Sequence, residues 1–180
     1  MQLDVRNTAI QDVKTIHQFR SDDYRGSFVK TFHATALQEQ GITFVLKESF
    51  YSVSVNHVIR GMHFHHPPYD HAKIIYCTHG KILDVALDLR KQSDTYGQFT
   101  TCELSFDNHT AMYIPSGFAH GFLTLSTEAC TCYLVSGEYN SGADDGIRFD
   151  SFGLDWQNEF PILSERDLSF TTLEHFQSPF

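Results

Sequence analysis

Short runs of β-branched and aromatic residues recur along the whole chain, and this recurrence constrains the fold more than any other feature. Gly, Pro, Asn and Ser separate the runs, as turns separate strands. Ten strands are expected, at residues 13–19, 28–32, 44–54, 57–65, 72–78, 81–89, 98–105, 111–115, 121–125 and 130–135. Helix signals are confined to residues 34–40 and 164–176, with Ser164 as the N-cap of the second.

A domain with about ten strands must hide its sheet edges, either by closing into a barrel or by packing two sheets together. We therefore predict an all-β fold, a jelly roll or small barrel with short peripheral helices, formed as a single domain over residues 1–180. The His79-Gly80 pair predicts a tight hairpin turn. In the run 81–89, leucine and valine alternate with Asp84 and Asp88, which predicts a half-buried strand with both aspartates on its open face.

Charge and composition exclude several classes of protein. The formal net charge is −9, so the positive field that drives nucleic-acid binding is missing. No apolar run approaches 18 residues and the first residues lack a signal peptide, so we expect a cytoplasmic protein without a membrane partner. The four cysteines, Cys77, Cys102, Cys130 and Cys132, form no C-x-x-C pair and are expected to be reduced thiols.

Histidines gather in two segments that could hold a site. The segment 60–73 contains His63, His65, His66 and His71, and the segment 114–122 delivers His120 from a turn onto a strand. Titratable side chains that converge in a barrel mouth are typical of functional sites.

The spacing of these histidines permits two chemistries. His63, His65 and His120 could bind a divalent metal, and P-x-G-x-x-H at 115–120 fits a cupin motif, although Asp70 is the only acid close behind His65. The alternative needs no metal: one histidine acts as a base, a carboxylate orients it, a lysine stabilises developing negative charge and a tyrosine returns a proton.

Six motifs occur in order between about residue 19 and residue 167. They are D-Y-R-G-S-F at 23–28, R-G-M-H-F at 60–64, P-P at 67–68 with A-K at 72–73, D-V-A-L-D-L-R-K at 84–91, I-P-S-G-F-A-H-G-F at 114–122 and G-I-R at 146–148. With these motifs the chain resembles the dTDP-4-keto-6-deoxyglucose 3,5-epimerase (dTDP-4-dehydrorhamnose 3,5-epimerase) family of dTDP-rhamnose biosynthesis.

The resemblance implies a cupin-type jelly-roll barrel that works without metal or other cofactor and forms a homodimer, with an N-terminal strand reaching the partner. It implies inversion at C3, C5 or both of a nucleotide-linked 4-keto-6-deoxy sugar. By the same resemblance, His63 is the base, Asp167 pairs with it, Tyr133 donates a proton from the opposite face, and Lys73 lies near the ketone oxygen.

The resemblance also implies the residues that contact the substrate. Arg25 and Arg60 would hold the phosphates, and His120 and Tyr139 would lie near the sugar. Other contact positions depart from the family pattern, and they are Lys30, Glu48, Phe50, His65, His71, Asp144 and Arg166. Altered contacts around an unaltered catalytic set leave CDP and GDP open beside dTDP, and leave open a single-centre epimerase, a ketoisomerase or a non-catalytic binder.

One positional problem follows from strand geometry. Strict alternation places Arg60 and His63 on opposite faces of one strand, although both are expected to reach the same ligand. A β-bulge at Gly61 would bring them to the same face, because one extra residue reverses the alternation beyond it.

Overall fold

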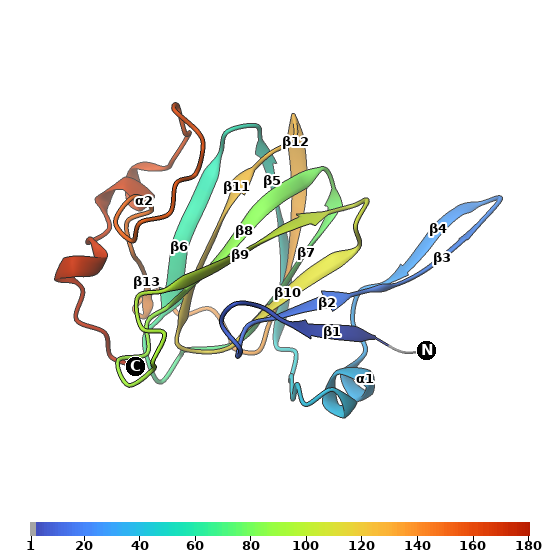
Figure 1. Cartoon of the computed structure of the whole chain (residues 1–180), viewed down its shortest axis with the longest axis horizontal. Helices are drawn as coiled ribbons and strands as arrows, with labels where there is room; N and C mark the ends of the chain where they lie inside the picture. Colours follow the sequence, from blue (N-terminus) through green and yellow to red (C-terminus); the bar gives the residue numbers. More distant parts are fainter. Residues whose placement is uncertain (1–2) are drawn as a thin grey trace.

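Two antiparallel sheets form a barrel, and a two-stranded hairpin projects from it (Figure 1). The computed structural model describes residues 3–180. The six-stranded sheet has the order β1 (Asp4–Asn7), β2 (Lys14–His17), β10 (Thr110–Ile114), β7 (Lys73–His79), β12 (Glu128–Val135) and β5 (Glu48–Val55). The five-stranded sheet has the order β13 (Asp144–Gly146), β6 (Ile59–His65), β11 (Phe118–Thr124), β8 (Lys81–Asp88) and β9 (Phe99–Ser105). The predicted all-β jelly-roll class is confirmed.

Apolar side chains from both sheets fill the space between them. Ile75 and Met112 from the six-stranded sheet meet Ile82 and Phe122 from the five-stranded sheet, and none of the four is more than 1% exposed. All seven residues of β11 are buried, as expected for a central strand covered on both faces. Apolar packing therefore fills one part of the barrel, and polar side chains line its mouth.

The expectation that residues 81–89 form a half-buried strand is wrong. Asp84 and Asp88 are both 0% exposed, as are Val85 and Leu87 on the other face of β8. One face of β8 looks into the barrel. The other is covered by the C-terminal segment, whose Trp156 belongs to the same apolar cluster as Val85 and Leu87. Alternation within one strand carries no information about a cover supplied by a distant segment.

The His79-Gly80 pair is a turn, but the expected hairpin is wrong. β7 pairs with β10 and β12, whereas β8 pairs with β9 and β11, so the turn carries the chain from one sheet to the other. Gly80 has φ +66°, and a Cβ there would overlap the carbonyl oxygen of Glu128. A glycine is therefore required where the chain changes sheets.

Several element boundaries differ from the expected ones. The chain contains β1, β3 (Phe19–Asp23) and β13, which were not predicted, and residues 44–47 are not part of a strand. The hairpin of β3 and β4 (Gly26–Lys30) follows β2, where a single strand was expected to end at residue 19. β13 has the sequence DDG. These residue types are depleted in strands, so the residue pattern does not predict a strand there.

Helices are short and peripheral, as predicted. α1 spans Ala34–Glu39, and the second expected helix is two elements, α2 (Glu165–Ser169) and the 3-10 helix η1 (Leu173–His175). Ser164 caps α2 as expected, because its Oγ accepts the backbone N–H of Asp167 at 3.1 Å. Within residues 3–180, no helix has the length and apolar character needed to cross a membrane.

Candidate active site

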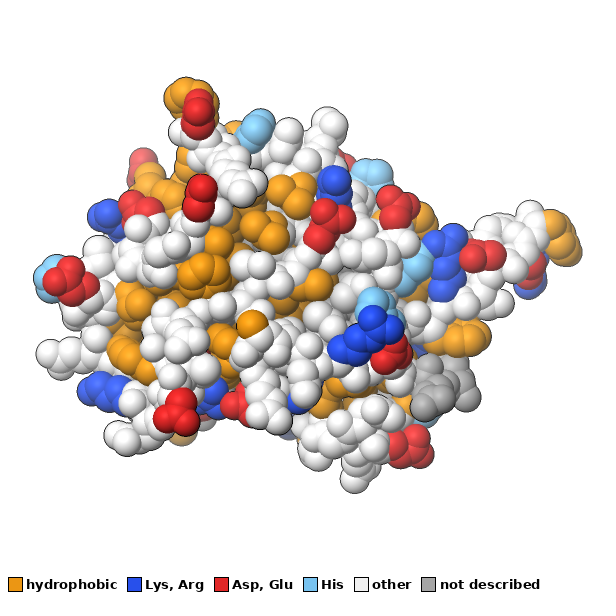
Figure 2. All heavy atoms as spheres, in the orientation of Figure 1, with side chains coloured by type: hydrophobic (Ala, Val, Ile, Leu, Met, Phe, Trp, Pro, Cys, Tyr) orange, Lys and Arg blue, Asp and Glu red, His pale blue; other side chains and the backbone are white. Residues whose placement is uncertain are grey.

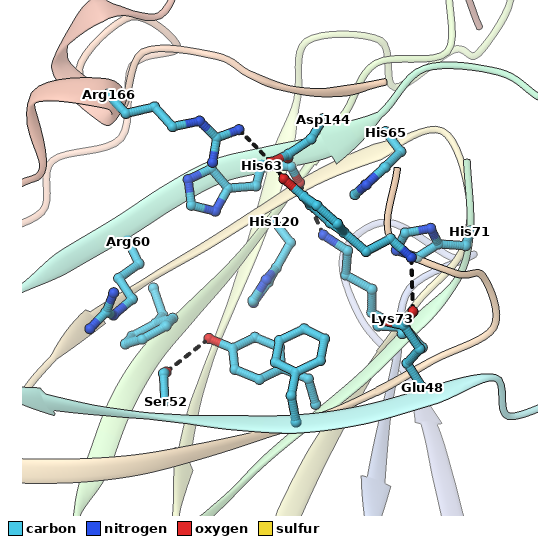
Figure 3. A pocket seen from close by; sticks show the side chains of 15 residues that line it. Glu48, Ser52, Arg60, His63, His65, His71, Lys73, His120, Asp144 and Arg166 are labelled. Atoms are coloured by element: carbon cyan, nitrogen blue, oxygen red, sulfur yellow. Dashed lines mark hydrogen bonds and ion pairs between the residues drawn. The ribbon is translucent and has the colours of Figure 1, made fainter. Parts of the chain in front are cut away.

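A pocket of about 270 Å³ opens in the mouth of the barrel (Figure 3). Strands of both sheets supply its walls. Ten of the predicted site residues line it: Glu48, Arg60, His63, His65, Lys73, His120, Tyr133, Tyr139, Asp144 and Arg166. Side chains separated by more than 100 positions in the sequence thus surround one cavity.

His63 and Asp167 form a hydrogen-bonded pair at the wall that β6 supplies. Asp167 Oδ1 lies 2.9 Å from His63 Nε2, and Asp167 Oδ2 accepts the backbone N–H of Gly61 at 3.1 Å. Burial raises the pKa of Asp167, but the hydrogen bonds from His63, Gly61 and Ser164 outweigh it and leave the pKa below its usual value. The ionised carboxylate fixes the hydrogen on Nε2, so Nδ1 is the basic nitrogen of the ring.

Lys73 lies beside this pair, at the start of β7. Its Nζ donates to the backbone carbonyl oxygen of His63 at 3.1 Å. Burial lowers the pKa of Lys73 to about 8, and the nearby carboxylates of Asp144 and Asp84 oppose that shift. The side chain is therefore mainly an ammonium at neutral pH, with little solvent to screen its charge.

Tyr133 approaches the pocket from the other sheet. It belongs to β12, is 8% exposed, and its ring stacks on Phe50 with centroids 4.7 Å apart. Its hydroxyl lies 3.3 Å from Ser52 Oγ. Burial raises the pKa of Tyr133, so the phenol keeps its proton at neutral pH and can donate it.

A second histidine–carboxylate pair lies deeper in the barrel. His120 on β11 is directly opposite His63 on β6 in the sheet, and its Nε2 lies 2.7 Å from Asp84 Oδ1. Burial lowers the pKa of His120 and raises that of Asp84. Sequence reasoning missed Asp84 because the alternation in its strand assigned it to solvent.

The bulge proposed at Gly61 is confirmed. His120 is paired with His63 and Phe122 with Arg60, so two positions on β11 correspond to three on β6. Arg60 and His63 consequently both line the pocket. Gly61 has φ +136°, and a Cβ there would lie 2.5 Å from the Cα of Gly121. Only glycine fits at this close approach of two strands.

A chain of polar contacts crosses the rim of the pocket. Glu48 Oε1 accepts the backbone N–H of Tyr139 at 3.0 Å, and the hydroxyl of Tyr139 donates to Asp144 at 3.4 Å. Asp144 is also paired with Arg166, at 2.8 Å. Arg166 belongs to the same helix as Asp167, so α2 supplies both a rim cation and the partner of His63.

Arg25 and Lys30 do not join this pocket within one chain. Both belong to the β3–β4 hairpin, whose strands pair only with each other among the described residues. The space-filling view shows the hairpin clear of the barrel, with hydrophobic atoms at its end (Figure 2), where Tyr24 is 97% exposed. Arg25 pairs with Asp23 at 2.6 Å.

The histidines are not arranged as a metal centre. The Nε2 atoms of His63 and His120 are each held by a carboxylate, and His65 packs against His71. In the part of the chain that the structure describes, no three His, Cys, Asp or Glu side chains converge as metal ligands do. The three-histidine metal interpretation therefore has no support in the geometry.

The barrel and its pocket define a class of protein, a cupin-type barrel equipped for acid–base chemistry at the centre of its mouth. Within that class, the family model for dTDP-4-dehydrorhamnose 3,5-epimerase matches residues 7–175. The chain belongs to this family, which confirms the resemblance read from its motifs, and its activity is that of an isomerase of sugar nucleotides in deoxysugar biosynthesis.

Three relatives illustrate the similarity. The dTDP-4-dehydrorhamnose 3,5-epimerase of Methanothermobacter thermautotrophicus is 40% identical over 84% of each chain. The dTDP-4-dehydrorhamnose 3-epimerase of Streptomyces niveus is 36% identical over 91% of this chain and 80% of its own. The dTDP-6-deoxy-D-glucose-3,5-epimerase of Legionella pneumophila, solved with dTDP-4-keto-L-rhamnose, is 31% identical and superposes with a TM-score of 0.93 over 98% of this chain and 95% of its own.

Proposed function

We propose that the protein inverts C3, C5 or both of a dTDP-linked 4-keto-6-deoxy sugar, without a cofactor. The observation that carries the proposal is the placement of a base and a proton donor on opposite walls of one pocket. His63 belongs to the five-stranded sheet and Tyr133 to the six-stranded sheet, and Lys73 lies beside His63. Inversion of a carbon next to a ketone requires this arrangement, because the proton leaves one face and returns to the other.

The reaction follows from the protonation states of these groups. Nδ1 of His63 takes the proton from the carbon next to the ketone, and the electron pair of that C–H bond moves onto the ketone oxygen as an enolate. The ammonium of Lys73 stabilises this oxyanion in a site that little water reaches. The enolate then collapses, and the carbon takes the phenolic proton of Tyr133 on its opposite face. Solvent afterwards takes the proton from His63 and returns one to Tyr133.

Asp167 and His120 assist these steps without exchanging a proton with the sugar carbon. Asp167 holds the hydrogen on Nε2 of His63 and stabilises the imidazolium that forms. His120, held by Asp84, offers its other nitrogen to the sugar beside Lys73.

The phosphates of the substrate are proposed to lie between Arg60 and Arg166. Both guanidinium groups line the pocket, and Arg is suited to bidentate contacts with phosphate. The Legionella relative is solved with a dTDP sugar, which favours dTDP over CDP and GDP here.

We propose a homodimer in which the hairpin of one copy completes the pocket of the other. This would give Arg25 and Lys30, which are remote from the pocket of their own chain, a role at a substrate. The edge strand β5 also presents an exposed apolar row, in which Tyr51 is 70% exposed and Val53 and Val55 about half. Sedimentation of the purified protein tests this, because a monomer at micromolar concentration would contradict it.

The four unpaired thiols agree with a cytoplasmic location.

Proton NMR in D2O with EDTA tests the reaction. The 4-keto-6-deoxyhexose is presented on dTDP, CDP and GDP, and deuterium at C3, C5 or both identifies the inverted centres. Exchange with the dTDP sugar in EDTA supports the proposal. Exchange that appears only after a divalent metal is added, or only with another nucleotide, contradicts it.

A further inference from the structure

Two neighbouring histidine rings form a part of the pocket that the proposed reaction does not use. His65 comes from β6 and His71 from the loop before β7, and their ring centroids are 4.8 Å apart. Both rings line the pocket, on the side away from Arg60 (Figure 3). Their hydrogen bonds fix which nitrogen of each ring carries the hydrogen.

The state of His71 follows from its carbonyl partner. Its Nδ1 lies 3.0 Å from the backbone oxygen of Tyr69, and a carbonyl oxygen can only accept. Nδ1 therefore carries the hydrogen, and Nε2 of the neutral ring is an acceptor. The ring packs closely over Gly137, where a Cβ would lie 2.8 Å from Nδ1. The absence of a side chain at Gly137 is what gives the ring this place.

The state of His65 follows from a donor. Its Nε2 accepts the backbone N–H of Asn140 at 3.4 Å, so Nδ1 carries the hydrogen and is a donor. Burial lowers the pKa of both His65 and His71, so both rings are neutral at pH 7. His71 lies two positions before Lys73 in the chain, and the side chains of His65, His71 and Lys73 line the same pocket, so the pair lies on the side of the ammonium that we assign to the ketone oxygen.

We propose that His65 and His71 recognise a ring hydroxyl next to the ketone, and thereby select hydroxylated sugars over sugars that are deoxygenated or carry an ammonium there. This inference rests on the proposed function. The pair offers one N–H donor and one nitrogen acceptor, and a hydroxyl can engage both at once. An ammonium only donates and would oppose the N–H of His65, and a deoxygenated carbon would leave two half-buried polar groups unpaired.

The selectivity can be measured by following deuterium uptake at both C3 and C5 in two dTDP-linked 4-keto sugars that differ only in the C3 hydroxyl. The wild-type kcat/KM should favour the hydroxylated sugar by about 100-fold or more. His71→Phe keeps a planar ring without the acceptor, and should reduce this preference to less than about tenfold, mainly through KM. An unchanged preference, or an equal loss with both sugars, would overturn the proposal.

His66→Phe is the matched control. His66 lies next to His65 in the chain, pairs with Asp145 at 2.9 Å and does not line the pocket, so the variant should keep the wild-type preference. A loss of preference in this control would also count against the proposal.

Long-range ¹⁵N–¹H spectra of the ¹⁵N-histidine-labelled wild-type protein at pH 7 provide a test that needs no turnover. They should place the hydrogen on Nδ1 of both His65 and His71, and a hydrogen on Nε2 of either ring would overturn the inference. If the wild-type protein exchanges neither sugar, the proposed reaction is wrong, and the spectra still decide the donor–acceptor pair. If it exchanges both sugars equally, the reaction stands and the hydroxyl selection is wrong.

Discussion

Tyr133 and His63 face one another across the pocket from different sheets, the tyrosine from β12 and the histidine from β6. The separation is a property of the barrel and not of any loop, because each side chain is held by a strand with neighbours on both sides. In the proposed mechanism, this arrangement holds the two groups on opposite faces of the sugar ring.

Tyr133→Phe should separate proton removal from inversion. The base is untouched, so deuterium should still enter the substrate from the side of His63. The rate at which the inverted product forms should fall by about 100-fold or more, because the donor on the other face is gone. Product NMR measures both quantities. Inversion at the wild-type rate would contradict the assignment of Tyr133. The control is Tyr113→Phe, because the ring of Tyr113 packs against Phe44 and does not line the pocket.

Asp167→Asn should lower kcat by about 10³-fold with little change in KM. The amide keeps the shape of the carboxylate but no longer fixes the hydrogen of His63 or stabilises its charged form. Deuterium uptake in single-turnover mixtures checks this. Asp145→Asn, at the carboxylate that pairs with His66, should leave the rate close to wild type, and equal losses in both variants would refute the role of Asp167.

Activity should fall as the pH rises through about 8. The ammonium of Lys73 is the form that stabilises the oxyanion, and burial lowers its pKa to about 8 from the ordinary 10.5. A profile of kcat/KM between pH 6 and pH 10 checks this. A rate that keeps rising to pH 10 would show that the neutral amine is the active form.

The same group should make the folded state more stable as the pH rises from about 8 to about 10.5. In that window the unfolded chain binds a proton at Lys73 that the folded chain has lost, so the free energy of unfolding increases with pH. Lys73→Met should remove this contribution and raise stability at pH 7 by up to about 3 kcal/mol. Urea unfolding at pH 7 and pH 10 measures the difference, and a Met variant less stable than wild type at pH 7 would contradict it.

Gly61→Ala should destabilise the protein by about 3 kcal/mol or more. The new methyl group would lie 2.5 Å from the Cα of Gly121, and φ at this position is +136°. Gly142→Ala is the matched control, because its methyl group would meet only Asn140 Oδ1, at an ordinary 3.4 Å. Urea unfolding should separate the two variants clearly, and similar stabilities would mean that the strands can move apart at the bulge.

Much of the barrel could be predicted from the sequence, because most strands carry their own pattern of β-branched and aromatic residues. The bulge at Gly61 could also be predicted, since two residues needed at one site stood on opposite faces of a strand. The burial of Asp84 could not be predicted from the sequence. It depends on the barrel interior and on the contact with His120, and the residue pattern of β8 indicates neither of them. Nor could the change of sheet at Gly80 be predicted, since a tight turn has the same composition whether or not its two strands pair.

The site residues also fall into those that the sequence pattern indicates and those that it does not. His63 and His120 were visible as members of dense histidine segments, whereas Tyr133 and Asp167 became candidates only through the resemblance to a family. A tyrosine on a buried strand and an aspartate in the first turn of a helix have ordinary structural explanations. The roles proposed for them rest on the distances that the fold creates, such as the 2.9 Å between Asp167 and His63.

The position of Asp167 also sets the order in which the site is assembled during synthesis. Asp167 follows His63 by 104 positions, and every strand of the barrel lies before it in the chain. On the ribosome, the strands are complete before α2 emerges, so the pocket can take shape around a histidine that still lacks its carboxylate. In the proposed mechanism, the strands can therefore bring His63 and Tyr133 to the pocket before Asp167 pairs with the base, and full activity is reached only when α2 has docked.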